Sequence, residues 1–127
     1  MNKIGSLNLA VKNLDAAMAF YADLFGFKEL TTHRSEHFRV LDANGVLFGF
    51  NDAVSAAPYG GLATGGMILS FDVAAPADVE RISDEAVARG AILKQVAQET
   101  NFGAIGALLI DPEGHAFRIL AWLRPPL

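Results

Sequence analysis

The stretch Leu7-Asn8-Leu9-Ala10-Val11 has a counterpart in the middle of the chain, Met67-Ile68-Leu69-Ser70-Phe71. In both stretches every second residue is large and apolar, which is the period of two expected of a β-strand with one face on a core. The two stretches align without a gap. The sequence therefore predicts two strands that open two related segments of chain.

A helical pattern follows each of these strands and ends at a glycine. Asn13 is a suitable N-cap for a helix whose apolar residues recur at helical spacing as far as Gly26. Pro76 is a suitable first residue for a second amphipathic helix, which we expect to end at Gly90. Gly26 and Gly90 thus hold matching places in the two segments.

After each helix the sequence predicts a run of short strands. The expected strands cover residues 27–32, 38–41 and 46–50 in the first segment and residues 91–96, 104–110 and 115–123 in the second. The last two strands of each segment are separated by an Asp-x-x-Gly turn, at residues 42–45 and 111–114. The pattern predicts an α+β protein of tandem βαβββ units, 1–52 and 66–127, joined by a linker at 53–65 within a single domain, 1–127.

Composition excludes several classes of protein. The net charge of −4 provides no basic stripe for nucleic acid, and no apolar run is long enough for a membrane span. With no Cys and no signal-peptide pattern, we expect a cytoplasmic protein without disulfides. Counting Gly in place of Tyr, hydrophobic residues reach roughly 60% against about 45–50% in soluble domains, so we expect a homodimer that covers apolar surface.

Four motifs are similar to those of a known family. They are Leu9-Ala10-Val11-Lys12-Asn13-Leu14, Phe20-Tyr21, Leu24-Phe25-Gly26-Phe27 and Asp111-Pro112-Glu113-Gly114. With these motifs the chain resembles the vicinal oxygen chelate superfamily, which includes glyoxalase I, extradiol dioxygenases, and fosfomycin and bleomycin resistance proteins. The resemblance implies that the two units form a cup-shaped mixed sheet with helices on its outer face, and that a divalent metal usually lies on the floor of the cup.

The resemblance also implies where the metal ligands should stand. Matching the motifs places them at Ser6, Gly49, Gly66 and Arg118, where the metalloenzymes carry mostly His, Glu or Gln. Glycine has no ligating side chain, a neutral hydroxyl binds divalent metals poorly, and a guanidinium repels them. We therefore expect a superfamily member that lacks the metal ligands, with no metal and no cofactor.

The period-two pattern identifies the residues that should face the cup instead. The expected ligand-binding set is Ser6, Asn8, Leu47, Gly49, Asn51, Phe102, Arg118 and Trp122. Arg118 could clamp an anionic or carbonyl group of a ligand, or it could be paired internally or lie at a dimer seam. Trp122 could stack on a ring of the ligand, or it could be a core or interface residue.

These residues favour a metal-free small-molecule-binding protein of the bleomycin resistance type over an enzyme. The alternatives are a metal-dependent lyase, isomerase or dioxygenase with unrecognised ligands, and an interaction module without a ligand. Potential metal ligands gather only at residues 33–37, which we interpret as a solvated hairpin turn containing His33 and His37. His115 is expected to cover the last turn, and the roles of all three histidines stay open.

Overall fold

The computed structural model describes residues 2–126, which fall into two compact units, one reaching Thr64 and one starting at Gly65. The first unit contains β1 (Ser6–Ala10), α1 (Leu14–Phe25), β2 (Lys28–Glu29), η1 (Thr31–His33), β3 (Phe38–Asp42), β4 (Leu47–Asn51), α2 (Ala53–Ala56) and η2 (Ala57–Tyr59). The second contains β5 (Ile68–Asp72), α3 (Pro76–Ala88), β6 (Ile92–Glu99), β7 (Ala104–Ile110) and β8 (Ala116–Trp122). Within residues 2–126, no helix combines the length and apolar character needed to cross a bilayer.

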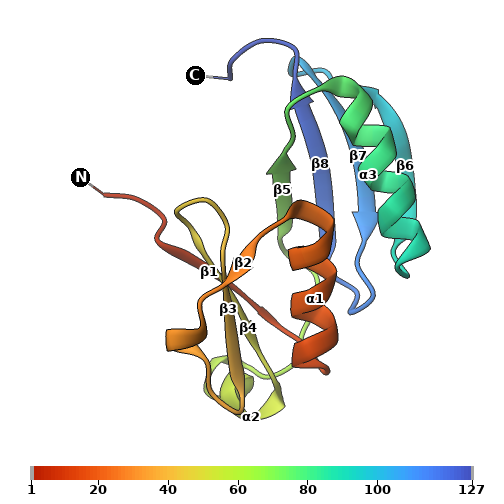
Figure 1. Ribbon diagram of the computed structural model, residues 1–127. Coiled ribbons are helices and arrows are strands. Elements are labelled where there is room, and N and C mark those ends of the chain that lie inside the picture. Colours follow the sequence, from red (N-terminus) through yellow and green to blue (C-terminus); the bar gives the residue numbers. More distant parts are fainter. Residues whose placement is uncertain (1, 127) are drawn as a thin grey trace. The chain divides into compact units, whose positions relative to one another are not determined.

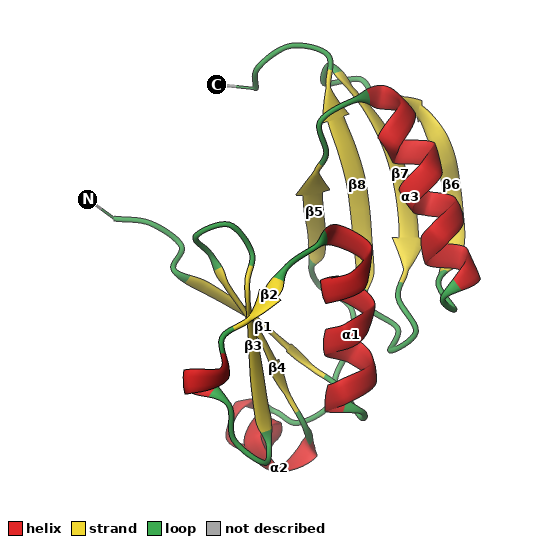
Figure 2. Cartoon of the chain, viewed as in Figure 1, coloured by secondary structure: helices red, strands yellow, loops and turns green. Residues whose placement is uncertain are grey.

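Both units have the same topology, which confirms the predicted α+β fold of tandem βαβββ units. The strand order is β1-β4-β3-β2 in one four-stranded sheet and β5-β8-β7-β6 in the other (Figures 1 and 2). In each sheet the first strand pairs in parallel with the last, and the other pairs are antiparallel. Figure 1 shows α3 lying along one face of the second sheet.

The predicted ends of the long helices are confirmed. The side chain of Asn13 accepts a hydrogen bond from the backbone N–H of Ala16, and Gly26 ends α1 in the left-handed conformation with φ of 76°. Pro76 occupies the first turn of α3, where the carboxylate of Asp78 accepts a hydrogen bond from the N–H of Ala75.

The core of each unit lies between its helix and its sheet. Tyr21 of α1 is fully buried, with its ring centroid 5.0 Å from that of Phe48 and 5.9 Å from that of Phe50. Both phenylalanines therefore point toward the helix, as the alternation along this strand predicts. In the second unit Phe117, Ile119 and other alternate residues are buried against α3.

Two segments differ in local structure from the sequence prediction. The expected strand at residues 27–32 is short, because β2 pairs with β3 at only two positions before the chain turns into the 3-10 helix η1. The expected linker at 53–65 contains α2 and η2. This helix forms because Asp52 accepts hydrogen bonds from the backbone N–H groups of Val54 and Ser55, and the segment that follows is rich in alanine.

Candidate functional site

The strand pairings correct the alignment of the two halves of the sequence. The backbone N–H of Val11 donates to the last residue of β4 at 2.8 Å, and that of Val73 donates to the matching strand β8 at 2.7 Å. Ser6 and Ile68 are the first residues of β1 and β5. The counterpart of Ser6 is therefore Ile68, and the assignment of Gly66 to that position is wrong because glycines precede β5 without being part of it.

The residues at the implied metal positions do not fit a divalent metal. Ile68 has a hydrocarbon side chain, Gly49 has none, and Ser6 offers one neutral hydroxyl. The last position holds Arg118, whose permanent positive charge repels a cation. Across residues 2–126, no group of three or more His, Cys, Asp or Glu side chains is placed to hold a metal ion.

Arg118 lies in the middle of β8, in register with Ser70 of β5 on one side and Leu108 of β7 on the other. Its Nε donates a hydrogen bond to the hydroxyl of Ser70 at 3.0 Å, and its Cζ lies 5.5 Å from the ring centroid of Phe102. Within residues 2–126 no carboxylate pairs with this guanidinium. Its two terminal nitrogens remain available for a ligand.

A cavity of about 220 Å³ opens beside Arg118 in the second unit. Its lining combines polar side chains with an apolar floor, and consists of Gln95, Gln98, Glu99, Thr100, Asn101, Phe102, Gly106, Ala107, Leu108, Arg118 and Leu120. Gly106 makes room in this floor, because a Cβ there would lie 2.7 Å from Cδ2 of Leu120. Such a mixture of apolar surface and convergent polar groups is typical of a small-molecule site.

Trp122 lies near the cavity without lining it. Its indole Nε1 donates a hydrogen bond to Asp72 at 3.1 Å, and its ring centroid is 5.6 Å from that of Phe102. Phe102 thus contacts both Trp122 and the guanidinium of Arg118. A ligand that moves Phe102 would change the surroundings of the indole.

The other predicted site residues lie on β1 and β4 of the first unit. Asn51 donates from its amide to Oδ1 of Asn8 at 3.2 Å, and a Cβ on Gly49 would lie 2.1 Å from that oxygen. Asn8 therefore covers the glycine, while Ser6 and Leu47 are exposed. The structure brings Phe102 and Arg118 to one cavity and places the first-unit residues on a separate sheet.

The polar wall formed by the side chains of Gln95 and Gln98 was not identified from the sequence. Both residues lie on β6, where the register against β7 shifts between Leu93 and Gln95 and again between Gln95 and Gln98. These bulges break the strict alternation on which the face predictions depend. Ser70 was placed in a strand, but only the pairing of β5 with β8 shows that it holds Arg118.

Arg39 is a buried cation of the first unit, and the sequence patterns did not identify it. Its guanidinium binds Glu29 through two hydrogen bonds, from Nε to Oε2 at 2.5 Å and from Nη2 to Oε1 at 2.7 Å, and Nη1 pairs with Asp15 of α1. The hydrogen bonding raises the pKa of Arg39 and lowers the pKa of Glu29. This network is satisfied internally, so it ties α1 to the sheet and offers little to a ligand.

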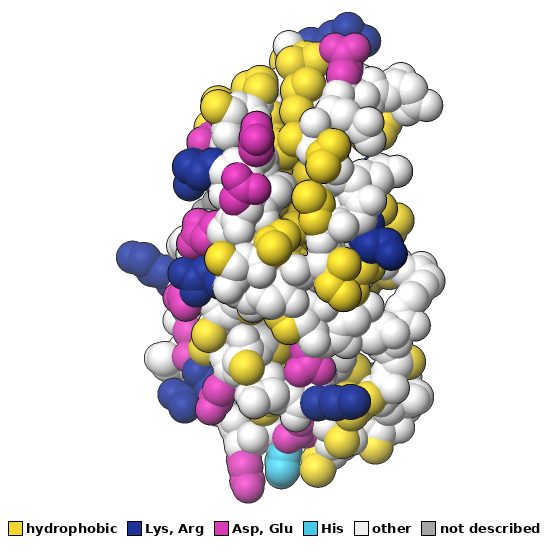
Figure 3. All heavy atoms as spheres, turned by 90° about the vertical axis from the view of Figure 1, so that its right-hand side faces the viewer, with side chains coloured by type: hydrophobic (Ala, Val, Ile, Leu, Met, Phe, Trp, Pro, Cys, Tyr) yellow, Lys and Arg dark blue, Asp and Glu magenta, His cyan; other side chains and the backbone are white. Residues whose placement is uncertain are grey.

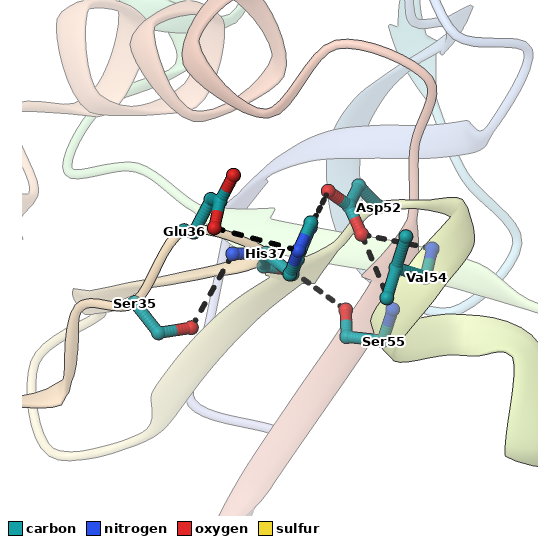
Figure 4. Close-up of polar contacts among 6 residues, drawn as sticks. All are labelled: Ser35, Glu36, His37, Asp52, Val54 and Ser55. Atoms are coloured by element: carbon teal, nitrogen blue, oxygen red, sulfur yellow. Dashed lines mark hydrogen bonds and ion pairs between the residues drawn. The ribbon is translucent and has the colours of Figure 1, made fainter.

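His37 is held by an acidic partner at the start of α2 (Figure 4). Its Nδ1 lies 2.7 Å from Oδ2 of Asp52, its Nε2 lies 3.8 Å from Glu36, and its carbonyl accepts from the hydroxyl of Ser55 at 2.6 Å. The hydrogen bond with Asp52 raises the pKa of His37 and lowers the pKa of Asp52. Figure 4 shows these side chains gathered around the imidazole, between β3 and α2.

The remaining histidines belong to turns. His33 ends the exposed 3-10 helix η1, with Nδ1 3.1 Å from the hydroxyl of Thr32. His115 is buried, and its backbone N–H donates to Oδ1 of Asp111 at 2.9 Å across the last turn. Its place agrees with the expected role of covering that turn.

Several solved structures share the fold of this chain over nearly its whole length. A structure described as a glyoxalase/bleomycin resistance protein/dioxygenase family enzyme from Burkholderia phytofirmans PsJN is 31% identical, with a TM-score of 0.89 over 96% of this chain and 100% of that chain. A lactoylglutathione lyase from Agrobacterium tumefaciens is 19% identical, with a TM-score of 0.74 over 95% of this chain and 94% of that chain. The second likeness shows the fold alone.

A fosfomycin resistance protein from Listeria monocytogenes, solved with Mn(II) and a sulfate ion, also shares the fold. It is 15% identical, with a TM-score of 0.75 over 96% of this chain and 91% of that chain. Comparison with curated protein sequences finds no match. The sequence model described as Glyoxalase/Bleomycin resistance protein/Dioxygenase superfamily matches residues 3–119. This chain belongs to the glyoxalase/bleomycin resistance protein/dioxygenase superfamily.

Proposed function

We propose that this chain is a metal-free small-molecule-binding protein whose ligand carries a carboxylate group held by Arg118. The proposal rests on the hydrogen bonding of the Arg118 side chain. Its Nε is occupied by Ser70, and its terminal nitrogens have no carboxylate partner among residues 2–126. A planar guanidinium in this state can bind an anionic oxygen pair through two parallel hydrogen bonds.

The surroundings of Arg118 support a partly apolar ligand. Leu108 and Leu120 form an apolar floor, and Phe102 presents an aromatic ring to the guanidinium. Water is a weaker competitor for a charged hydrogen bond over such a surface than in open solvent. The superfamily's metalloenzymes need side chains that bind a metal, and the matching positions of this chain do not provide them. This favours binding of a ligand over metal-dependent catalysis.

Titration of the purified protein with 4-methylbenzoate and its uncharged analogue 4-methylbenzamide tests the proposal. The single Trp residue provides a fluorescence signal beside Phe102. We expect the carboxylate to bind more tightly than the amide, and Arg118→Gln to remove the difference. Arg81→Gln, an exposed arginine of α3 paired with Asp78, is the matched control and should change neither affinity. Equal affinities for both compounds in the parent protein would refute the clamp.

The proposal also includes a homodimer. Large apolar side chains are exposed on β6 and at the end of α3, namely Ile92, Leu93, Val96 and Val87. Figure 3 shows hydrophobic side chains gathered in a band on the upper part of that view, beside charged side chains. Such surface is usually covered by another molecule. Sedimentation at micromolar concentration should give a dimer, and a monomer would remove this part of the proposal.

A further inference from the structure

Strand pairing decides which lining residues of the cavity share a face with Arg118. Partners in neighbouring antiparallel strands present their side chains on the same face of a sheet. Arg118 is the partner of Leu108 on β7, and Leu108 is the partner of Gln95 on β6, so these three side chains form one row. Glu99 is the partner of Ile105, three residues from Leu108 along β7, so its carboxylate lies on the opposite face. Among the described residues that line the cavity, Arg118 therefore supplies the only charge on this face.

A second row on the same face contributes another amide. Gln98 is the partner of Gly106, and Gly106 is the partner of Leu120. Gly106 has no side chain, and Cδ2 of Leu120 lies only 2.7 Å from where its Cβ would be, so Leu120 lies close to the backbone of β7 at this point. No side chain of β7 therefore stands between Gln98 and the apolar floor that Leu120 provides.

The glutamine amides on this face are free to bind a ligand. Gln95 and Gln98 line the cavity, and neither side chain hydrogen-bonds to another residue within residues 2–126. A primary amide carries both donors and an acceptor, so it can exchange two hydrogen bonds with another primary amide. A charged group at this end of a ligand would lose solvation without meeting an opposite charge among the lining side chains of this face. The glutamine wall therefore favours a neutral polar group.

The distance between Arg118 and Gln98 suits a ligand built on a single ring. β7 separates β8 from β6, and neighbouring strands lie about 4.8 Å apart, so the backbones of these two strands are separated by roughly 10 Å. Both side chains are long, and both line the same cavity of about 220 Å³. A benzene ring with polar groups at its opposite ends can therefore meet both.

We propose that the cavity binds an amide-bearing carboxylate, whose carboxylate meets Arg118 and whose neutral amide, at the far end, meets Gln98. This inference rests on the proposed function, because it keeps Arg118 as the carboxylate clamp. It adds the amide of the ligand and assigns its recognition to Gln98. The apolar middle of the ligand lies over Leu120, beside the ring of Phe102.

The experiment compares 4-carbamoylbenzoate, which carries both groups, with 4-methylbenzoate, which lacks the amide, and with 4-(aminomethyl)benzoate, whose far end is charged. Affinities are measured by Trp122 fluorescence and by titration calorimetry. We expect 4-carbamoylbenzoate to bind about fivefold more tightly than 4-methylbenzoate, the gain expected of one net hydrogen bond, and 4-(aminomethyl)benzoate to gain nothing.

Gln98→Met keeps the approximate length of the side chain and removes its amide. It should abolish the advantage of 4-carbamoylbenzoate without weakening 4-methylbenzoate. Lys94→Met, at an exposed position of the same strand outside the cavity lining, is the matched control and should leave the advantage unchanged. Thermal unfolding of each variant confirms that the fold is intact.

The possible outcomes separate this inference from the proposed function. If 4-methylbenzoate binds through Arg118 as tightly as 4-carbamoylbenzoate does, or if Gln98→Met keeps the advantage, the amide-bearing ligand is refuted and the clamp stands. Tighter binding of 4-(aminomethyl)benzoate than of 4-carbamoylbenzoate refutes it as well. If no carboxylate binds, or if Arg118→Gln leaves every affinity unchanged, the clamp and the amide-bearing ligand fail together.

Discussion

Arg118 and Ser70 face each other across the parallel strands β8 and β5, and Nε of the arginine donates a hydrogen bond to the serine hydroxyl at 3.0 Å. This contact occupies Nε and leaves the two terminal nitrogens of the guanidinium for a ligand. It also limits the rotation of the side chain, so less conformational entropy is lost when the terminal nitrogens bind a carboxylate.

Ser70→Ala should therefore weaken carboxylate binding without disturbing the fold. Loss of one orienting hydrogen bond corresponds to about fivefold lower affinity for 4-methylbenzoate. Ser70→Thr keeps the hydroxyl and should restore most of the affinity. Ser35→Ala, which removes an exposed hydroxyl from the other unit, is the control. Equal weakening by Ala and Thr would show that the hydroxyl of Ser70 does not position Arg118.

Gly106→Ala should destabilise the second unit and close part of the cavity. The added Cβ would lie 2.7 Å from Cδ2 of Leu120 and 3.3 Å from Cγ2 of Thr100, so both side chains must move. We expect a loss of about 1–2 kcal/mol in the free energy of unfolding, measured by urea denaturation. Gly5→Ala has nothing within 4 Å of the new Cβ and should change stability by less than about 0.5 kcal/mol. Similar effects of both variants would contradict the packing described for Leu120.

The ion pair between Arg39 and Glu29 should give the protein an acid-sensitive stability. Because the hydrogen bond from Arg39 lowers the pKa of Glu29, its contribution is present above the ordinary glutamate pKa of about 4.3 and is lost as pH falls through the lower folded value. Glu29→Gln should cost about 2 kcal/mol at pH 7 and flatten the loss of stability below about pH 4. Glu80→Gln is the exposed control. If the stability of the Glu29 variant still falls as steeply at low pH as that of the parent protein, other carboxylates control the acid sensitivity.

The pair of His37 and Asp52 should make the start of α2 sensitive to pH in the opposite sense. Since Asp52 raises the pKa of His37, the stabilisation is complete below the ordinary histidine pKa of about 6.5 and is lost as pH rises through the higher folded value. Proton NMR should show His37 titrating above 6.5. Asp52→Asn keeps an oxygen to cap α2 but removes the charge, and should return the pKa of His37 toward its ordinary value. No change in this variant would refute the assignment.

The donor set predicts protein without a bound divalent metal. Elemental analysis of protein purified without chelators should find nickel, zinc, manganese and iron far below one per chain, and a chelator should leave the thermal unfolding temperature unchanged. Near-stoichiometric metal would instead revive an enzymatic role. It would direct attention to His33, Glu36 and His37, where potential ligands gather in the sequence.

Much of the fold could be predicted because its signals are local. Three such signals are the alternating apolar residues of β1, the N-cap Asn13 and the left-handed Gly26. Each acts on the neighbouring backbone, so a few adjacent residues are enough to predict its effect. The short helix α2 was missed because its main signal is a single aspartate cap within a segment rich in Ala and Gly. Arg118 could be assigned to the face opposite the helix from the alternation of β8 alone.

What the tertiary structure decided is which distant residues meet. The sequence by itself determined the repeat, the helix ends and the absence of ligating side chains at three of the implied metal positions. It could not bring Ser70 to Arg118, place Gln98 in the same cavity, or pair Arg39 with Glu29. Those contacts depend on the order of strands in the sheet and on the bulges of β6, which shift the register by whole residues. Side chains that are remote in sequence are brought together by strand pairing, and local periodicity carries no information about it.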